Sequence, residues 1–219
     1  LEVIILDSSP SASLVEKDLV ELNQSESLKF SYIRTHAHGV NSKRNLGLDW
    51  SQGPVTLFLD DDCEVSSSEF FTRHVQFHHA NSDIPILGGS YDNNPIGIIG
   101  RAYKKIHLSW RQMTDLIPPI VGGNLSLKSH QSAAWLRFDE SFFFGSTERE
   151  LILRAFDQGL NCKYEPDLVV RHHIKMTVLN FVKKAFLQGR SEVVLWKRYC
   201  HLQNSAAGEA FHSFRDHLM

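Results

Sequence analysis

The chain has 219 residues, 42% of them hydrophobic and 22% charged, which is enough apolar content for the core of a soluble globular protein. The formal net charge of −2 argues against a nucleic-acid-binding protein, because such proteins need a broadly basic surface. The three cysteines are odd in number and far apart, which argues against a disulfide framework or a cysteine-rich zinc site and favours a reducing cytoplasm.

The first half of the chain alternates short apolar runs with amphipathic stretches. Residues 1–7 (LEVIILD) and 28–33 (LKFSYI) are typical of buried strands, as are residues 55–60 (VTLFLD). Helical spacing of apolar residues follows the first two runs, and a serine-rich helix start follows the third. Repeated strand–helix units predict an α/β fold with a Rossmann-like, mostly parallel twisted sheet flanked by helices. The three helices are predicted over residues 11–24, 40–52 and 66–79.

The second half is less regular. A strand ending in glycines is predicted first, then a helix, a strand-like stretch with a Gly-Gly-Asn turn, a helix ended by Gly159, and two short strands around Pro166. These elements cover residues 84–89, 101–113, 118–129, 146–159 and 161–174 in that order.

The tail of the chain predicts one more amphipathic helix, over residues 177–198. We expect a domain at 1–175 and a helical extension at 176–219 that packs on it through a core-facing apolar stripe. The alternative is contact of Trp196 and Tyr199 with another subunit or, peripherally, with the inner face of a membrane.

Three aspartates, Asp60, Asp61 and Asp62, end the third predicted strand abruptly. Ligands of open α/β sheets bind beyond the carboxyl ends of the strands. Crowded carboxylates repel one another unless a cation or hydrogen-bond donors stabilise them, and Mg²⁺ or Mn²⁺ takes such oxygens together with phosphate. The pattern therefore favours a metal–diphosphate site. A solvated acidic turn before the serine-rich helix is the alternative.

Six segments give the aspartates a wider context. In chain order they are GVNSKRNLG, FLDDD, IVGGNLSLKS, FDESFFFG, PDLVVRHH and FLQGRS. From Leu1 to about Ser191, their order and spacing resemble those of the inverting glycosyltransferases of family 2, which have the GT-A fold.

The resemblance implies a donor site. Asp60 would face the ribose of a nucleotide sugar and Asp62 would hold Mn²⁺ or Mg²⁺, with Asp61 as a neighbour in the same site. Asp7 matches a nucleobase- or ribose-binding aspartate, and Arg44 matches a position near the nucleotide. The competing interpretations are a helix N-cap for Asp7 and a solvated helix cation for Arg44.

The resemblance also implies a catalytic base. Glu148 takes the place of the family's catalytic aspartate, while Thr147 stands where the family carries an acid. A carboxylate within hydrogen-bond reach of the acceptor hydroxyl can act as a general base. The rival base is Glu150, and a helix-capping acid is the structural alternative for Glu148.

Acceptor and metal contacts complete the implied site. Gly123 and Asn124 match an acceptor loop, for which a simple tight turn is the alternative. His172 matches a histidine that reaches the metal or the diphosphate, although a lone strand histidine is often structural. His74 and His78 have zinc-compatible spacing but no third ligand nearby, so we interpret them as surface or packing residues.

The implied activity is metal-dependent, inverting transfer of a sugar from a nucleotide-diphosphate sugar to a hydroxyl of a carbohydrate or other acceptor, in the cytoplasm. No segment matches the family's usual first strand; Leu1 aligns with its second. A non-catalytic GT-A-like binding or assembly module is therefore the alternative. A nucleotidyltransferase is disfavoured, since no glycine-rich, lysine-containing phosphate loop is found.

Overall fold

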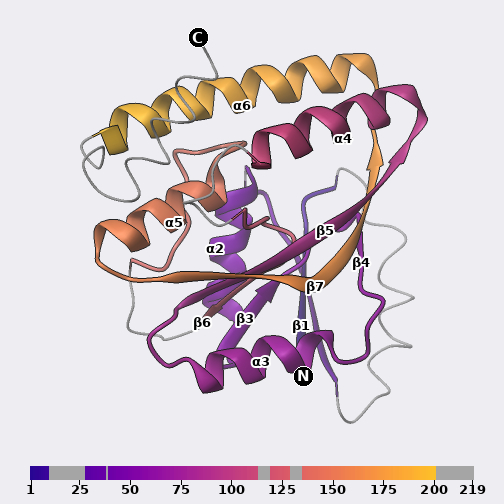
Figure 1. Ribbon diagram of the computed structural model, residues 1–219. Helices are drawn as coiled ribbons and strands as arrows, with labels where there is room; N and C mark the ends of the chain where they lie inside the picture. The colour runs from indigo at the N-terminus through magenta and orange to yellow at the C-terminus, as the bar shows by residue number, and fades with distance from the viewer. Residues whose placement is uncertain (10–27, 38, 113–118, 129–134, 201–219) are drawn as a thin grey trace.

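A computed structural model describes residues 1–9, 28–37, 39–112, 119–128 and 135–200 (Figure 1). The predicted helix over 11–24 and the end of the predicted extension, 201–219, lie outside these residues. The described elements are β1 (Glu2–Asp7), β2 (Lys29–Arg34), α2 (Val40–Trp50), β3 (Val55–Phe58), β4 (Cys63–Glu64), α3 (Phe70–Ala80), β5 (Ile86–Ile96), α4 (Gly97–Gln112), β6 (Leu125–Lys128), α5 (Thr147–Asp157), β7 (Cys162–Lys175) and α6 (Val178–Tyr199).

The strands of the described residues form two sheets. β1 and β2 pair in parallel as one, and the other has five strands in the order β3-β6-β5-β7-β4. In the larger sheet β5 and β7 are parallel and long, whereas the β3–β6, β5–β6 and β4–β7 pairs are antiparallel. The α/β class is confirmed, but the larger sheet is mixed rather than mostly parallel. Hydrophobic patterning marks a strand without encoding its direction, which explains the difference.

The region around Pro166 forms one continuous strand, β7, instead of the two predicted. The register between β5 and β7 shifts between Gly89 and Ser90, where residues 166–168 bulge out of the ladder. Proline has no N–H to donate, so a bulge accommodates it without a lost ladder bond. The Ser90 hydroxyl donates to the Pro166 carbonyl at 2.8 Å and holds the bulge in place.

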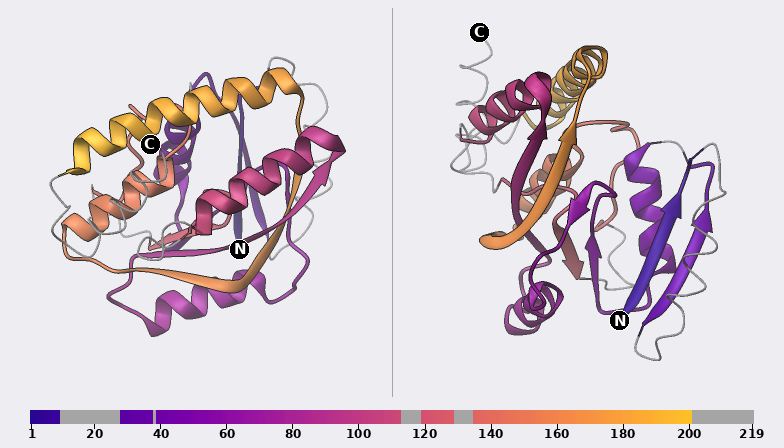
Figure 2. Two further views of the ribbon diagram at one scale, coloured as in Figure 1. Left: turned by 45° about the horizontal axis from the view of Figure 1, so that its top comes forward. Right: turned by 90° about the vertical axis from the view of Figure 1, so that its right-hand side faces the viewer.

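Helices cover both faces of the larger sheet (Figures 1 and 2). Ile86 packs with apolar residues of α5, and the next residue, Leu87, packs on the opposite face with Phe70 of α3. This alternation follows from the two-residue period of a strand. β6 repeats it, because Leu125 and Leu127 join the α5 side. The helices α4 and α6 lie side by side as an outer layer above the sheet.

The face of β6 toward α3 is polar and buried. Ser126 Oγ lies 2.8 Å from His74 Nδ1 and 2.9 Å from His78 Nε2, and all three residues are buried. The histidines are packing residues, as one of the two interpretations held, and neither is on the surface. Burial lowers the pKa of each imidazole from 6.5 to about 4.

These histidines should make the fold acid-sensitive. Their folded pKa values lie below the unfolded value, so their contribution to stability is complete above about pH 6.5 and is lost as the pH falls toward 4. We expect the free energy of unfolding to be lower at pH 5 than at pH 7.5 by about 2 kcal/mol for each imidazole. Urea unfolding at several pH values between 5 and 7.5 measures this difference. His78→Gln should flatten the dependence and the exposed His79→Gln should not; equal slopes in all three proteins would contradict the assignment.

Candidate active site

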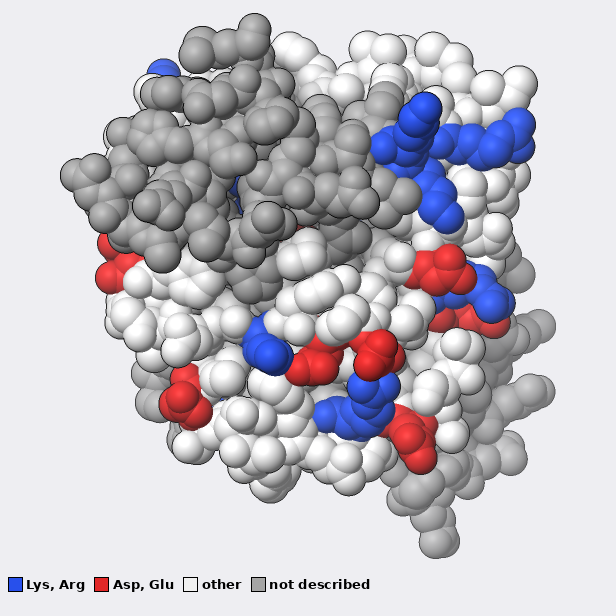
Figure 3. Space-filling view, in the orientation of Figure 1, with Lys and Arg blue, Asp and Glu red and all other residues white. Residues whose placement is uncertain are grey.

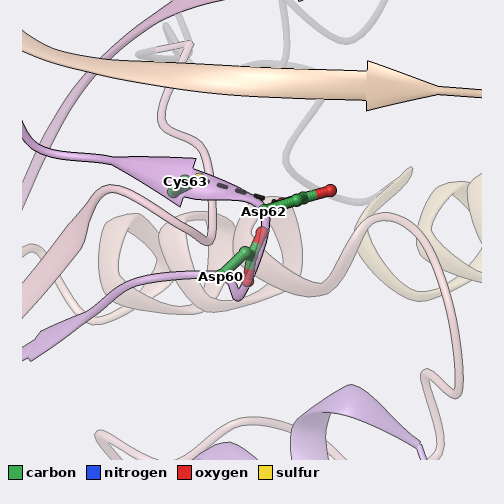
Figure 4. A group of neighbouring side chains, drawn as sticks. All are labelled: Asp60, Asp62 and Cys63. Atoms are coloured by element: carbon green, nitrogen blue, oxygen red, sulfur yellow. Dashed lines mark hydrogen bonds between the residues drawn. The ribbon is translucent and has the colours of Figure 1, made fainter.

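The predicted acidic site lies in the turn between β3 and β4. One side-chain ligand atom from each of Asp60, Asp62 and Cys63 lies within 4.8 Å of the others (Figure 4). Asp61 is exposed and stands outside this group. Burial raises the pKa of Cys63 to about 12, so the thiol is protonated in the metal-free site and the negative charge of the group lies on its carboxylates. The two carboxylates therefore suit a hard cation such as Mn²⁺ or Mg²⁺.

His172 reaches the same site from β7. Strand β4 pairs with β7 so that Cys63 lies opposite His172, and His172 Nε2 is 3.2 Å from Asp62 Oδ2. His172 Nδ1 lies 2.9 Å from Asn93 Oδ1; a proton on Nδ1 would leave Nε2 for a metal. Burial acts to raise the pKa of Asp62, but His172 outweighs it and the pKa is lowered. The fold thus brings together the two predicted metal ligands.

Tyr91 joins three parts of the site and was missed at the level of sequence. Its hydroxyl donates to Asp60 Oδ2 at 3.1 Å and accepts from the backbone N–H of Gly123 at 2.9 Å. Its ring stacks on the imidazole of His172, with 4.5 Å between centroids. An aromatic residue in a strand is ordinary, so no sequence signal distinguished it.

Arg44 connects the aspartates to the predicted base. Its guanidinium is buried, with Nη1 3.0 Å from Glu148 Oε1 and Nη2 3.4 Å from Asp60 Oδ1. Burial acts to lower the pKa of Arg44, but the charges of Glu148 and Asp60 raise it overall. Arg44 is therefore not a solvated helix cation. Its contact with a nucleotide stays a prediction.

Glu148 lies in the first turn of α5 and is held as a carboxylate. Burial acts to raise its pKa, but the charge and hydrogen bond of Arg44 outweigh burial and lower it. The helix follows two residues with left-handed backbone, Gly145 at φ 76° and Ser146 at φ 54°. A non-glycine residue persists in this conformation where its surroundings fix it.

Helix α6 supplies those surroundings. Ser146 Oγ donates to Glu192 Oε1 at 2.6 Å, and Ser191 Oγ donates to the Phe144 carbonyl at 2.5 Å. Arg149, in the first turn of α5, also pairs with Glu192 at 2.6 Å. These bonds fix the start of α5 and, with it, the position of Glu148.

Glu150, the rival base, is occupied by hydrogen bonds within the protein. Its carboxylate is buried and accepts two hydrogen bonds from Arg154, at 3.0 and 2.9 Å. The Tyr199 hydroxyl donates a third bond at 2.8 Å. This arrangement favours Glu148 over Glu150 as the residue that meets a substrate.

The Gly-Gly-Asn loop is a tight turn whose backbone lies close to the side chains of the candidate site. Asn124 N–H donates to the Val121 carbonyl at 3.0 Å, which closes the turn. A Cβ on Gly122 would lie 1.9 Å from Glu148 Oε1, and one on Gly123 would lie 2.3 Å from the Tyr91 hydroxyl. Only glycine leaves room for the backbone here.

The Asn124 side chain serves the fold. It is fully buried, and Nδ2 donates to the carbonyls of Ser90 and Leu168 at 2.9 and 2.7 Å. These bonds hold β5 to β7 beside the bulge. Contact of Asn124 or Gly123 with an acceptor stays a prediction, and for Asn124 it would require its amide to become uncovered.

Asp7 ends β1. Its carboxylate accepts from Ser9 N at 2.7 Å and from the Tyr32 hydroxyl at 2.5 Å, and hydrogen bonds from these residues lower its pKa to about 2. A cleft of about 320 Å³ lies beside it, between the ends of β1 and β2 and the start of α2. Ser8, Thr35, His36, Lys43 and Phe143 are among the residues that line it.

A family comparison agrees with this geometry. Residues 1–139, more than half of the 219-residue chain, match the model of Glycosyl transferase family 2. The chain belongs to glycosyltransferase family 2. An uncharacterized protein of Haemophilus influenzae is 32% identical over 84 residues, which are 37% of this chain and 45% of that protein. The chain thus spans less than half of this relative.

Solved structures share the GT-A fold with this family 2 chain. The mannosyltransferase PcManGT from Pyrobaculum calidifontis, in complex with GDP-Man and Mn²⁺, has a TM-score of 0.59 at 13% identity, covering 98% of this chain and 64% of its own. Glucosyl-3-phosphoglycerate synthase from Mycobacterium tuberculosis, with Mn²⁺, UDP-glucose and phosphoglyceric acid, has a TM-score of 0.61 at 14% identity, covering 89% and 67%. GalNAc-T7 with UDP, GalNAc and Mn²⁺ scores 0.63 at 13% identity, covering 97% and 52%. The expected family and fold are confirmed.

Proposed function

We propose that this chain is a metal-dependent inverting glycosyltransferase that moves a sugar from a nucleotide-diphosphate sugar to an acceptor hydroxyl. The observation that carries the proposal is the connection from Asp60 through the buried Arg44 to Glu148. A donor site at the aspartates beside a base at Glu148 is what a transfer reaction needs, so this connection supports the proposal. The structural neighbours that contain GDP-Man or UDP-glucose with Mn²⁺ support the donor class.

The donor side of the mechanism uses the turn after β3. Asp62, with His172, would hold Mn²⁺ or Mg²⁺, which when bound offsets the negative charge of the departing diphosphate. Asp60, fixed by Tyr91, would face the ribose, and Asp61 would lie beside it. Asp7 would bind the nucleobase or ribose at the other end of the donor.

The acceptor side uses Glu148. An ionised carboxylate can take the proton of the acceptor hydroxyl while that oxygen attacks the anomeric carbon. The attack comes from the face opposite the leaving diphosphate, so the configuration is inverted. Arg44 keeps Glu148 ionised before the acceptor arrives.

Nucleotide binding tests the proposal. We expect one of UDP, GDP, CMP or dTDP to raise the melting temperature in the presence of Mn²⁺, because a ligand that binds only the folded state stabilises it. Chelator should remove the shift, and Asp62→Asn should weaken it. Asp83→Asn, at an exposed acid after α3, is the matched control. If folded protein shows no shift with any nucleotide, the proposal fails and the non-catalytic module becomes the better interpretation.

A further inference from the structure

The outer layer of the molecule, α4 and α6, has one face toward the protein and one toward solvent. Tyr103 of α4 contacts Phe181 of α6, with 6.3 Å between ring centroids. On α6 the inward face is marked by Ser191, Glu192 and Leu195, all buried. No helix among the described residues combines the length and apolar character needed to cross a bilayer.

The solvent face of this layer carries large apolar side chains. Residues 179, 182, 186 and 193 are three, four and seven positions apart, which aligns them along one flank of α6 for about 21 Å. Each is more than half exposed, and so is Ile98 near the start of α4. We call these residues the outer apolar stripe: Ile98, Leu179, Val182, Phe186 and Val193.

Basic residues border the stripe. Lys183, Arg190 and Lys197 follow one another at seven-residue intervals and form a row along the same flank of α6. Further exposed basic residues lie on α4 and at the end of β7, and Figure 3 shows basic side chains gathered over this part of the molecule. The outer cations are Arg101, Lys105, Lys175, Lys183, Arg190 and Lys197.

Acidic residues do not neutralise this face. None of the outer cations has an ion-pair partner among the residues that the structure describes. The sequences of α4 and α6 contain a single acid, Glu192, and it is buried and paired with Arg149. The face is thus locally basic on a chain whose formal net charge is −2.

We propose that the outer apolar stripe and the outer cations dock the protein on an anionic lipid bilayer. Helices with exposed apolar side chains beside lysine and arginine lie in the interface of such membranes, with the apolar flank in the acyl boundary and the cations at the headgroups. A second copy fits less well, because pairing through this face would bring like charges together. Nucleic acid would satisfy the cations but leave the apolar side chains in water.

The docking face and the candidate active site share α6. Glu192, on the inward side of this helix, holds Ser146 and Arg149 at the start of α5. A membrane-bound molecule would therefore keep Glu148 one helix layer away from the lipid surface. The docking proposal does not depend on the transferase activity, since it stands on the solvent face alone.

Vesicle co-sedimentation tests the proposal. We expect the protein to bind vesicles that contain phosphatidylglycerol more than about tenfold tighter than vesicles of phosphatidylcholine alone, and added salt should weaken this binding. The Leu179→Ser/Phe186→Ser variant should lose at least about tenfold in binding. Its matched control, Phe71→Ser/Val75→Ser, changes two partly exposed residues one turn apart on α3 and should bind normally.

A second pair of variants tests the charges. Lys183→Gln/Lys197→Gln should weaken binding to anionic vesicles by about tenfold or more, and Lys29→Gln/Lys163→Gln, at exposed lysines elsewhere, should not. The proposal is overturned if folded wild type does not bind these vesicles. It is also overturned if the stripe variant and the lysine variant each bind as tightly as their matched controls. Self-association that the stripe variant abolishes would assign the face to a second copy. Nucleotide stabilisation is measured without lipid, so the two proposals fail separately.

Discussion

Replacing Glu148 with glutamine is expected to lower sugar transfer by between about a hundredfold and ten-thousandfold, the range that general-base catalysis supplies. Glutamine preserves the shape of the side chain but cannot accept the acceptor proton. The Asp60, Asp62 and His172 side chains remain in place, so nucleotide and Mn²⁺ should still raise the melting temperature. Nucleotide release under single-turnover conditions, beside a thermal shift, separates the two effects.

Two control variants sharpen this expectation. Glu69→Gln, at an exposed acid beside α3, should transfer sugar at the wild-type rate. Glu150→Gln should lower stability, because it weakens the bonds to Arg154 and Tyr199. Wild-type turnover in Glu148→Gln would reject the assignment of the base.

Replacing Arg44 with methionine is expected to lower the free energy of unfolding by about 3 kcal/mol, the lower end of the range for removing one partner of a buried ion pair, because Arg44 is buried but Glu148 and Asp60 are partly exposed. The change leaves Glu148 and Asp60 near each other without the cation between them. The pKa of Glu148 should also rise, since Arg44 is what lowers it against burial. Urea unfolding gives the stability.

Arg137→Met is the matched comparison for Arg44→Met. Arg137 pairs with Asp49 at 2.5 Å, but both side chains are exposed, and exposed ion pairs contribute no more than about 1 kcal/mol. The two variants remove the same charge and add the same side chain. Similar small losses in both would show that the buried position of Arg44 does not make its ion pairs with Asp60 and Glu148 stronger than an exposed pair.

Much of the fold could be predicted because apolar patterning marks the elements locally. The predicted strands over 1–7 and 28–33 are β1 and β2, and the helix predicted over 146–159 is α5. Strand direction depends on which strands meet, and no local pattern carries that information. The antiparallel insertion of β6 between β3 and β5 was therefore not foreseen.

The residues of the candidate site also fall into two groups, those that the sequence indicates and those that only the fold reveals. Asp60, Asp62 and His172 stand in segments with a characteristic order, so the sequence alone singles them out. It does not single out Tyr91, because the role of this residue arises only where β5 passes Asp60 and the Gly123 loop. The burial of Arg44 likewise depends on residues more than a hundred positions away, at the start of α5.

The separation of the two sheets affects what a ligand must do. The described strands β1 and β3 share no ladder, and α2 contacts both regions: Gly47 lies against Leu6 of β1, and Arg44 reaches Asp60 beyond β3. A nucleotide sugar that contacted both Asp7 and Asp60 would bridge the two sheets and add to the contacts that α2 makes with each of them. Such a ligand would bind only the arrangement in which both carboxylates are in place, so its binding would also stabilise the packing of the two sheets against unfolding.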